Sequence, residues 1–247
     1  MRSPAVVTFD YWNTLMVADY AGQTEVRIAE MLRILGEAGV VAEPHLVRSS
    51  LAAAAREFED HWRRNSVYRA ADAVERVLSD QALIVADSTR VTLTDLITDP
   101  RPDHYPVPTP GIGDALEALR SAGVRVGIIC DVGLAPSRTL RRILESHDLL
   151  GFFDHWSFSD DVGTFKPDPA IFGHALAGLG APEPASAAHV GDLRRTDIAG
   201  ANALGITSVR YTGAFDDPGS PDEGTDAIEA TIVLADHAEL ASALGIG

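Results

Sequence analysis

Acidic residues stand at the ends of short apolar runs in this sequence, where a fold could bring them together. Asp10, Asp131 and Asp192 each come at the end of such a run, and Asp197 follows Asp192 by five residues. An aspartate in this position is often only a turn former or a helix cap. If the runs are parallel strands, however, their carboxyl ends meet at the edge of the sheet where ligands bind. Carboxylates that converge there are tolerated mainly when a cation neutralises them.

Lys166 is the single lysine of the chain, beside nineteen arginines, and it stands in the segment 164–169 (TFKPDP). It could be a surface residue that stayed lysine by chance. The alternative is a site that needs a compact ammonium, because the guanidinium group is a broad planar fork. Such a point charge suits a place beside a carboxylate nucleophile and the phosphate that it attacks.

Composition limits the classes of function. The net charge of −16 and the pI near 4.7 argue against a nucleic-acid or anionic-membrane surface. We expect neither a membrane span nor a signal peptide, since no run of eighteen apolar residues occurs. One cysteine, Cys130, fits a reducing cytoplasm, and the alanine and arginine content fits a bacterial protein. We therefore expect a cytoplasmic protein. A small anionic metabolite, if it is the substrate, would need local positive charge from a metal or from Lys166; the oligomeric state stays open.

The alternation of apolar runs and amphipathic stretches predicts a doubly wound parallel sheet of the α/β class. The expected strands are Ala5–Phe9, Val124–Cys130, His155–Phe158, Ala187–Val190 and Thr207–Tyr211, with a possible sixth at Thr231–Leu234. The expected helices between them are Gly113–Ala122, Ser137–Ser146, Ala170–Gly178 and Asp197–Leu204.

The pattern changes between the first strand and Pro106. Residues 22–99 contain amphipathic helical stretches, for example Glu25–Leu35 and His45–Trp62, and no convincing strand. We expect an α/β core of residues 1–16 and 106–247, with an all-helical domain of residues 17–105 inserted after the first strand. A bundle inserted at the ligand-binding edge of the sheet would be a lid.

The order of these motifs resembles the haloacid dehalogenase-like (HAD) hydrolase superfamily over nearly the whole chain. The matching features are the strand that ends in Asp10, the helical insertion, the Lys166 segment and the Gly191–Asp197 motif. The resemblance implies a Rossmann-like core with a cap of the type inserted after the first strand (C1). It implies a hydrolase, and most often a phosphatase.

The resemblance also implies roles for single residues. Asp10 would be the nucleophile that forms an aspartyl-phosphate, and Lys166 would hold it together with the phosphoryl oxygens. Asp10, Asp192 and the backbone carbonyl of Trp12 would bind Mg²⁺. Thr14 would orient the loop that carries Asp10.

Further roles concern the edges of the site. Asp197 would fix the metal environment or Lys166. Cys130 and Asp131 would contact the substrate together with Lys166, although relatives usually have serine or threonine where this chain has Cys130. A thiol is a much weaker hydrogen-bond donor than a hydroxyl.

Trp12 stands where phosphatases of this family have a second aspartate, which protonates the leaving group. Indole has no titratable proton for this role, and general acid–base help is worth about 10²–10⁴-fold. Three functions stay open: a Mg²⁺-dependent phosphate-ester hydrolase, which we favour; a catalytically weakened protein that binds a ligand; and a metal-independent 2-haloacid dehalogenase. Dehalogenases also lack the second aspartate, but they usually lack the carboxylate that Asp192 supplies here.

Overall fold

The chain divides into two compact units in a computed structural model, which describes residues 3–181 and 183–246, apart from the side chains of residues 20 and 21. One unit comprises the residues up to Ala18, residues 106–132 and the residues from Leu140 on. The other comprises residues 19–105 and 133–139. The short segment 133–139 thus groups with the inserted helices, which the strand–helix pattern gave no reason to expect.

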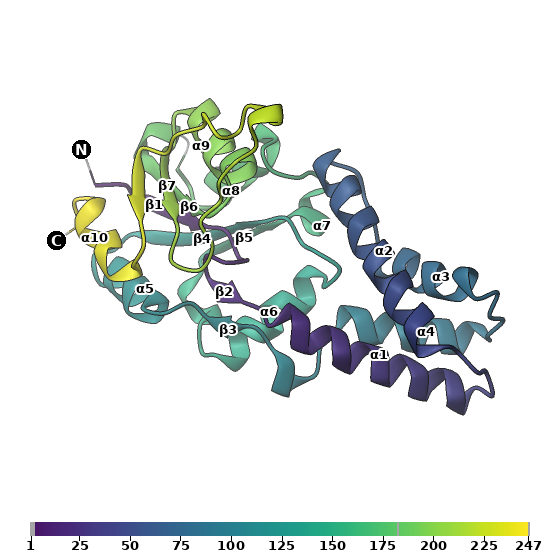
Figure 1. Cartoon of the computed structure of the whole chain (residues 1–247). Coiled ribbons are helices and arrows are strands. Elements are labelled where there is room, and N and C mark those ends of the chain that lie inside the picture. Colours follow the sequence, from purple (N-terminus) through teal and green to yellow (C-terminus); the bar gives the residue numbers. More distant parts are fainter. Residues whose placement is uncertain (1–2, 182, 247) are drawn as a thin grey trace. The chain divides into compact units, whose positions relative to one another are not determined.

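The first unit is built on a six-stranded parallel sheet in the order β5-β4-β1-β6-β7-β8 (Figure 1). Its strands are β1 (Val6–Phe9), β4 (Arg125–Cys130), β5 (His155–Phe158), β6 (Ala187–Gly191), β7 (Thr207–Tyr211) and β8 (Ile232–Leu234). The central strands are apolar runs buried on both faces, as parallel strands require. The predicted fold class is confirmed, and the possible sixth strand is present.

Helices connect the strands and cover both faces of the sheet (Figure 1). The main ones are α5 (Ile112–Ser121), α6 (Ser137–Ser146), α8 (Pro169–Gly178) and α9 (Ala199–Leu204), with short helices α7 (Ser159–Val162) and α10 (Leu240–Ala243). Helix α8 begins at Pro169, which suits the first position of a helix because it has no backbone N–H to be satisfied there. The carboxylate of Asp168 caps the helix by accepting from Ala170 N at 2.8 Å. Its buried Phe172 then packs over the sheet beside α9.

Register brings the ends of β1 and β6 to the same level. Phe9 pairs with Val190 on one side of β1 and with Ile128 of β4 on the other. The residues that follow these strands therefore emerge together at the carboxyl edge of the sheet. This is the edge at which the sequence predicts a ligand site.

A second, two-stranded antiparallel sheet was not predicted. It pairs β2 (Met16–Val17) with β3 (Val107–Pro108), at the two points where the chain leaves and re-enters the α/β unit. Two-residue strands carry too little periodicity to be seen in a sequence, and Pro108 argues against a strand. The pair joins the two ends of the insertion.

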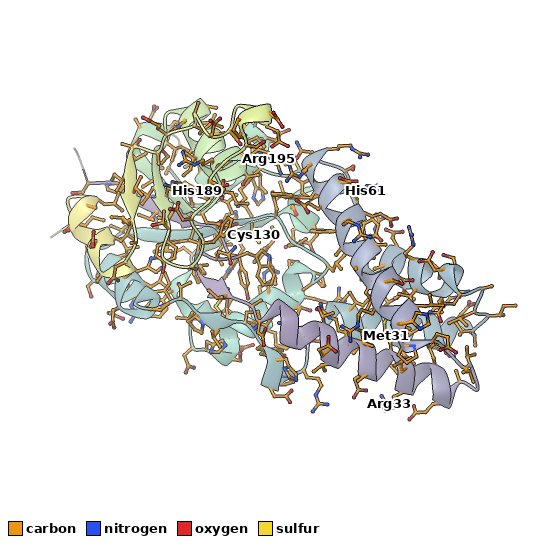
Figure 2. All side chains as sticks on the ribbon, viewed as in Figure 1. Met31, Arg33, His61, Cys130, His189 and Arg195 are labelled. Carbon is orange, nitrogen blue, oxygen red and sulfur yellow. The ribbon has the colours of Figure 1, made fainter. Side chains whose placement is uncertain are left out.

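The second unit is a helical bundle with its own core, and no strand occurs among its described residues. Its helices are α1 (Tyr20–Glu37), α2 (Pro44–Arg63), α3 (Ala70–Asp80) and α4 (Asp87–Thr98). Met31, labelled in Figure 2, is fully buried in the core of this unit, against which Leu134 of the segment 133–139 also packs. Within the described part of the chain, none of the helices has the length and apolar character needed to cross a membrane.

Candidate active site

Asp10 leaves the central strand β1 at the start of a tight turn. Its backbone N–H still donates to Val190 O at 2.8 Å, so the sheet fixes its position. The chain then reverses, because Tyr11 O accepts from the backbone N–H groups of Leu15 (3.0 Å) and Met16 (2.9 Å). Asn13 adopts a left-handed conformation with φ of 55°, which asparagine tolerates better than most residues. The Asp10 carboxylate is consequently buried at the edge of the sheet, 5% exposed.

Lys166 lies between two carboxylates, and its side chain is only 2% exposed. Its Nζ donates to Asp10 Oδ1 and, at 2.6 Å, to Asp197 Oδ1. Its backbone N–H donates to Asp131 Oδ1 at 2.9 Å. Asp131 thus holds the main chain of the lysine segment, a role that its position beside Cys130 did not suggest. The single lysine is buried as an ion-paired group, which excludes the alternative of a chance surface residue.

The chain after β6 carries Asp192 and Asp197. Asp192 follows the strand directly, and Asp197 lies in a π-helical turn, η4 (Arg194–Ile198), that precedes α9. The turn brings Asp197 Oδ2 to 3.1 Å from Leu193 N, which donates to it. A side chain at Gly191 would not fit, because its Cβ would lie 2.3 Å from Asp197 Cγ. The predicted helix from residue 197 therefore begins as a wider turn, a form that is frequent at functional sites.

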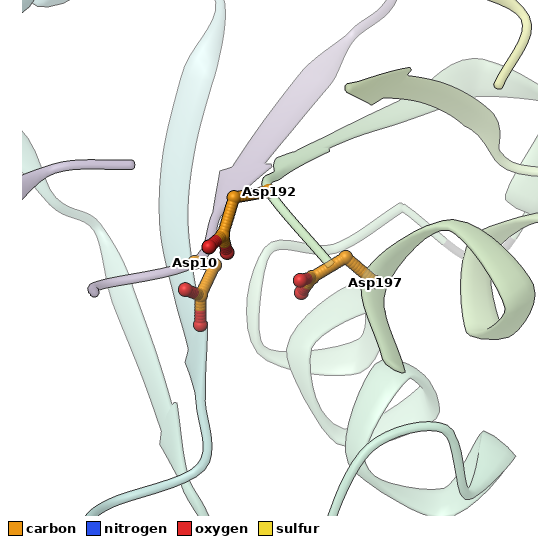
Figure 3. A group of neighbouring side chains, drawn as sticks. All are labelled: Asp10, Asp192 and Asp197. Carbon is orange, nitrogen blue, oxygen red and sulfur yellow. The ribbon is translucent and has the colours of Figure 1, made fainter. Parts of the chain in front are cut away.

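The side chains of Asp10, Asp192 and Asp197 lie close together at the edge of the sheet (Figure 3). One oxygen of each lies within 4.8 Å of the others. Two opposite ligands of Mg²⁺ are about 4.2 Å apart, so a small adjustment would let such oxygens share one ion. Both oxygens of Asp197 already accept hydrogen bonds, from Lys166 and Leu193, whereas the carboxylate of Asp192 accepts one from Asn13 Nδ2 at 3.1 Å. The donor set thus fits a hard divalent cation, with Asp10 and Asp192 as the better placed ligands.

Burial and mutual repulsion disfavour the charged forms of two of these groups. Burial raises the pKa of the Asp10 carboxyl from 3.8 to about 7, with Asp197 acting in the same direction and Lys166 opposing it. Burial also raises the pKa of Asp192 well above its usual value, and the charges of Asp10 and Asp197 add to this effect. Three carboxylates with one ammonium leave an excess of negative charge, which a bound cation would neutralise.

Lys166 and Asp197 form the ionised part of the cluster. Burial alone would lower the pKa of Lys166, but the carboxylates of Asp10 and Asp197 outweigh it and keep this pKa well above the usual value. Burial likewise opposes ionisation of Asp197, but Lys166 and the hydrogen bond from His189 lower its pKa below the ordinary range. Lys166 is therefore a fixed positive charge aimed at Asp10.

The remaining predicted residues lie around this centre in different ways. Thr14 is buried, but its hydroxyl finds no hydrogen-bond partner among the described residues. Its carbonyl instead accepts from Thr109 Oγ1 at 2.7 Å and His237 Nε2 at 2.9 Å, so the backbone of Thr14 anchors the loop. Burial and the charge of Asp10 raise the pKa of Cys130 well above its usual value, which keeps this residue a thiol. Trp12 is half-buried, with its ring edge-on to Tyr11 at 4.9 Å.

Several residues of the site were not found from the sequence. Asn13 binds Asp192, and His189 binds Asp197 with a nitrogen–oxygen distance of 3.0 Å. Arg194, which directly precedes Arg195 in the turn of Asp197, holds the acidic segment 212–229, because its Nη1 donates to Ile228 O at 2.6 Å. The sequence gave a weak signal for Asn13, because asparagine in a turn often adopts a left-handed conformation. It gave no signal for His189, because a histidine within an apolar run does not reveal its hydrogen-bond partner.

Comparison with known proteins gives a family. The family model for haloacid dehalogenase-like hydrolase matches residues 4–205. A glyceraldehyde 3-phosphate phosphatase from Methanopyrus kandleri is 36% identical over 107 residues, which are 43% of this chain and 44% of that protein. The chain spans only about two fifths of the length of the curated relatives that it matches.

Similar solved structures cover the chain more fully. A HAD phosphatase from Thermococcus onnurineus has a TM-score of 0.65 at 22% identity, with 99% of this chain and 98% of that chain covered. An L-2-haloacid dehalogenase from Xanthobacter autotrophicus has a TM-score of 0.60 at 16% identity, with 99% of both chains covered. At these identities the likeness establishes the fold, which phosphatases and dehalogenases share.

Proposed function

Because the chain belongs to the haloacid dehalogenase-like hydrolase family, we propose that it hydrolyses a small phosphorylated metabolite, with Asp10 as the nucleophile. The observation that carries this proposal is the buried contact between Lys166 Nζ and the Asp10 carboxylate. An ammonium in this place holds an anionic nucleophile beside an anionic phosphoryl group that would otherwise repel it. The matching relative from Methanopyrus kandleri, which is named a phosphatase, supports the choice of a phosphate ester.

A divalent cation completes the charge balance. Asp10, Asp192 and the backbone carbonyl of Trp12 would hold Mg²⁺, which, when bound, supplies positive charge to the phosphoryl oxygens. Asp197 would stay with Lys166, because its oxygens are already engaged. The carboxyl of Asp10 must be ionised to attack, and its pKa of about 7 in the absence of a cation explains why neighbouring positive charge matters.

The proposed reaction has two displacements at phosphorus. The Asp10 carboxylate attacks the phosphorus atom, and the bond from phosphorus to the leaving oxygen breaks to give an aspartyl-phosphate and a free leaving group. Water then attacks the same phosphorus, and the bond to Asp10 breaks to release inorganic phosphate. Trp12 cannot donate a proton in the first step or accept one in the second. The leaving group therefore departs as an anion, and we expect activated phosphates to be the better substrates.

A series of leaving groups tests this function. Aryl and acyl phosphates should be cleaved measurably in Mg²⁺, whereas alkyl phosphates should lag by about 10²–10⁴-fold, the value of the missing general acid. We expect a burst of leaving group followed by slow turnover, since water attack also lacks its base. Asp10→Asn should abolish the burst, and Asp222→Asn, on the exposed turn η5 (Pro221–Glu223), is the matched control.

Three results would contradict the proposal in different ways. A flat dependence of kcat/KM on leaving-group pKa would mean that another residue supplies the proton. Chloride release from 2-chloropropionate that EDTA does not diminish would establish the dehalogenase function instead. If neither class of compound is turned over while Mg²⁺ still binds, the chain is the catalytically weakened member that the sequence left open.

A further inference from the structure

His189 is a buried histidine directly behind the candidate active site, and the chemistry proposed above gives it no task. It lies in the central strand β6, is 0% exposed, and is marked in Figure 2 within the α/β unit. Its ring and the ring of Phe172 form a T-shaped pair, with 5.2 Å between the ring centroids. Packing alone would be served by an apolar residue, since a buried imidazole needs partners for both of its nitrogens. Both nitrogens have such partners here.

The hydrogen-bond partners determine which nitrogen carries the proton. Nε2 lies 3.0 Å from Asp197 Oδ1, and a carboxylate oxygen can only accept, so Nε2 must donate. Nδ1 lies 2.9 Å from Thr8 Oγ1. Burial lowers the pKa of His189, which favours the neutral ring with a bare Nδ1. The Thr8 hydroxyl then donates to Nδ1 rather than along its longer contact of 3.3 Å to Ala188 O.

We infer that His189 is a positioning residue, which as the neutral Nε2–H tautomer links the Thr8 hydroxyl to Asp197 and so sets the place of Lys166. The oxygen that accepts from His189 is the same Oδ1 that accepts from Lys166 Nζ at 2.6 Å. Leu193 N holds the other oxygen, which leaves the Asp197 carboxylate no freedom to rotate. Lys166 is thereby kept in line with Asp10. The expected effect on turnover rests on the proposed function, whereas the tautomer and its hydrogen bonds do not.

The hydrogen bonds of His189 connect the two strands that carry the candidate metal-binding carboxylates. Thr8 and His189 come from the neighbouring strands β1 and β6, which pair residue by residue at this point. The same two strands carry Asp10 and Asp192 at their ends. A hydrogen-bond chain across the two strands therefore ties the orientation of the lysine to the backbone from which the nucleophile emerges. Removing hydrogen-bond partners that orient the groups of a site in this way commonly changes activity by about 10–100-fold.

Nuclear magnetic resonance of the intact protein labelled with ¹⁵N-histidine tests the tautomer without any substrate. Two-bond nitrogen–proton correlations distinguish the Nε2–H ring, the Nδ1–H ring and the imidazolium, and His189→Gln identifies the resonance. At neutral pH we expect the Nε2–H pattern, and Thr8→Val should shift the Nδ1 signal because it removes the donor. An Nδ1–H ring or an imidazolium would overturn the inference.

Kinetics on an activated phosphate test the consequence. His189→Leu should lower kcat by at least about tenfold with KM within about threefold, since Lys166 is misaligned with Asp10 while Asp10 and Asp192 keep their places. His189→Gln should recover most of kcat, because its amide can donate to Asp197. Phe172→Leu, which alters the packing on the ring but none of its hydrogen bonds, is the control and should leave kcat unchanged.

The kinetic outcomes separate the two proposals. Equal losses in His189→Gln and His189→Leu, or a loss in Phe172→Leu as large as in His189→Leu, would reduce His189 to a packing residue and refute the inference. If the wild type hydrolyses no phosphate at all, the proposed function fails. The tautomer measurement then still decides whether His189 holds Asp197 as stated.

Discussion

Replacing Asp10 by asparagine should stabilise the metal-free protein, and the gain should grow with pH. The folded state raises the pKa of Asp10 from 3.8 to about 7, so ionising this group costs free energy that the unfolded chain does not lose. Because the pKa of this carboxyl is raised on folding, the folded state loses stability progressively as the pH rises from the unfolded pKa to the folded pKa. Above the folded pKa the loss of stability is constant. A tenfold difference in the acid dissociation constant corresponds to about 1.4 kcal/mol. The gain should be about 1–2 kcal/mol at pH 5 and at most about 4 kcal/mol at pH 8.

Urea unfolding of the wild type and Asp10→Asn at pH 5, 6, 7 and 8 in EDTA measures this difference. The free energies of unfolding should diverge between pH 5 and 7 and then run parallel. Saturating Mg²⁺ should stabilise the wild type, by about 2.7 kcal/mol at one hundred times Kd, and should stabilise the variant less. A difference that is constant over the whole pH range would refute the reasoning, because it would mean that Asp10 ionises with an ordinary pKa. A wild type more stable than the variant at pH 8 would refute it as well.

Three further predictions concern the neighbours of Asp10. Asp192→Asn should weaken Mg²⁺ binding by at least about tenfold in calorimetric titration, since the site has few protein ligands; equal affinities would remove Asp192 from the metal site. Lys166→Arg should lose turnover nearly as fully as Lys166→Met, by at least about 100-fold, because a guanidinium does not fit between two buried carboxylates; an active arginine variant would contradict this. Gly191→Ala should lower stability by about 1–3 kcal/mol in urea unfolding, because its Cβ would meet Asp197 at 2.3 Å; unchanged stability would show that the turn can yield.

The parts of the structure that the sequence predicted well are those set by local pattern. A mainly apolar strand such as Val6–Phe9 is expected to be buried, and a polar residue that directly follows it is expected at the sheet edge. That reasoning predicted that Asp10, Asp192 and Lys166 would meet, and the structure brings their side chains together. The unusual choice of lysine in a chain rich in arginine pointed to the ion pair correctly.

The parts that the sequence missed depend on contacts between distant residues. The partners of His189 are 181 residues and 8 residues away along the chain, and nothing in its surroundings in the sequence names either. The carboxylate of Asp131 holds the backbone of Lys166, 35 residues further along the chain, a contact that the sequence did not suggest; its place beside the substrate stays a prediction. The π-helical turn at Asp197 accompanies a close approach of the Asp197 side chain to Gly191, which helix propensity does not predict.

The short β2–β3 pair brings together the two points at which the inserted helical segment leaves and re-enters the α/β unit. Val17 pairs with Val107, so the chain departs and returns within one strand spacing, about 5 Å. Residues 18–106 thus form an insertion whose two ends lie side by side. The entropic cost of closing such a loop depends only weakly on the number of residues in it. Helices of another number or length could be spliced in at the same junction without moving β1 or the strands beside it. Only the segment 133–139, which packs with the inserted helices, would have to change together with them, while the sheet edge that carries Asp10 and Asp192 could stay the same.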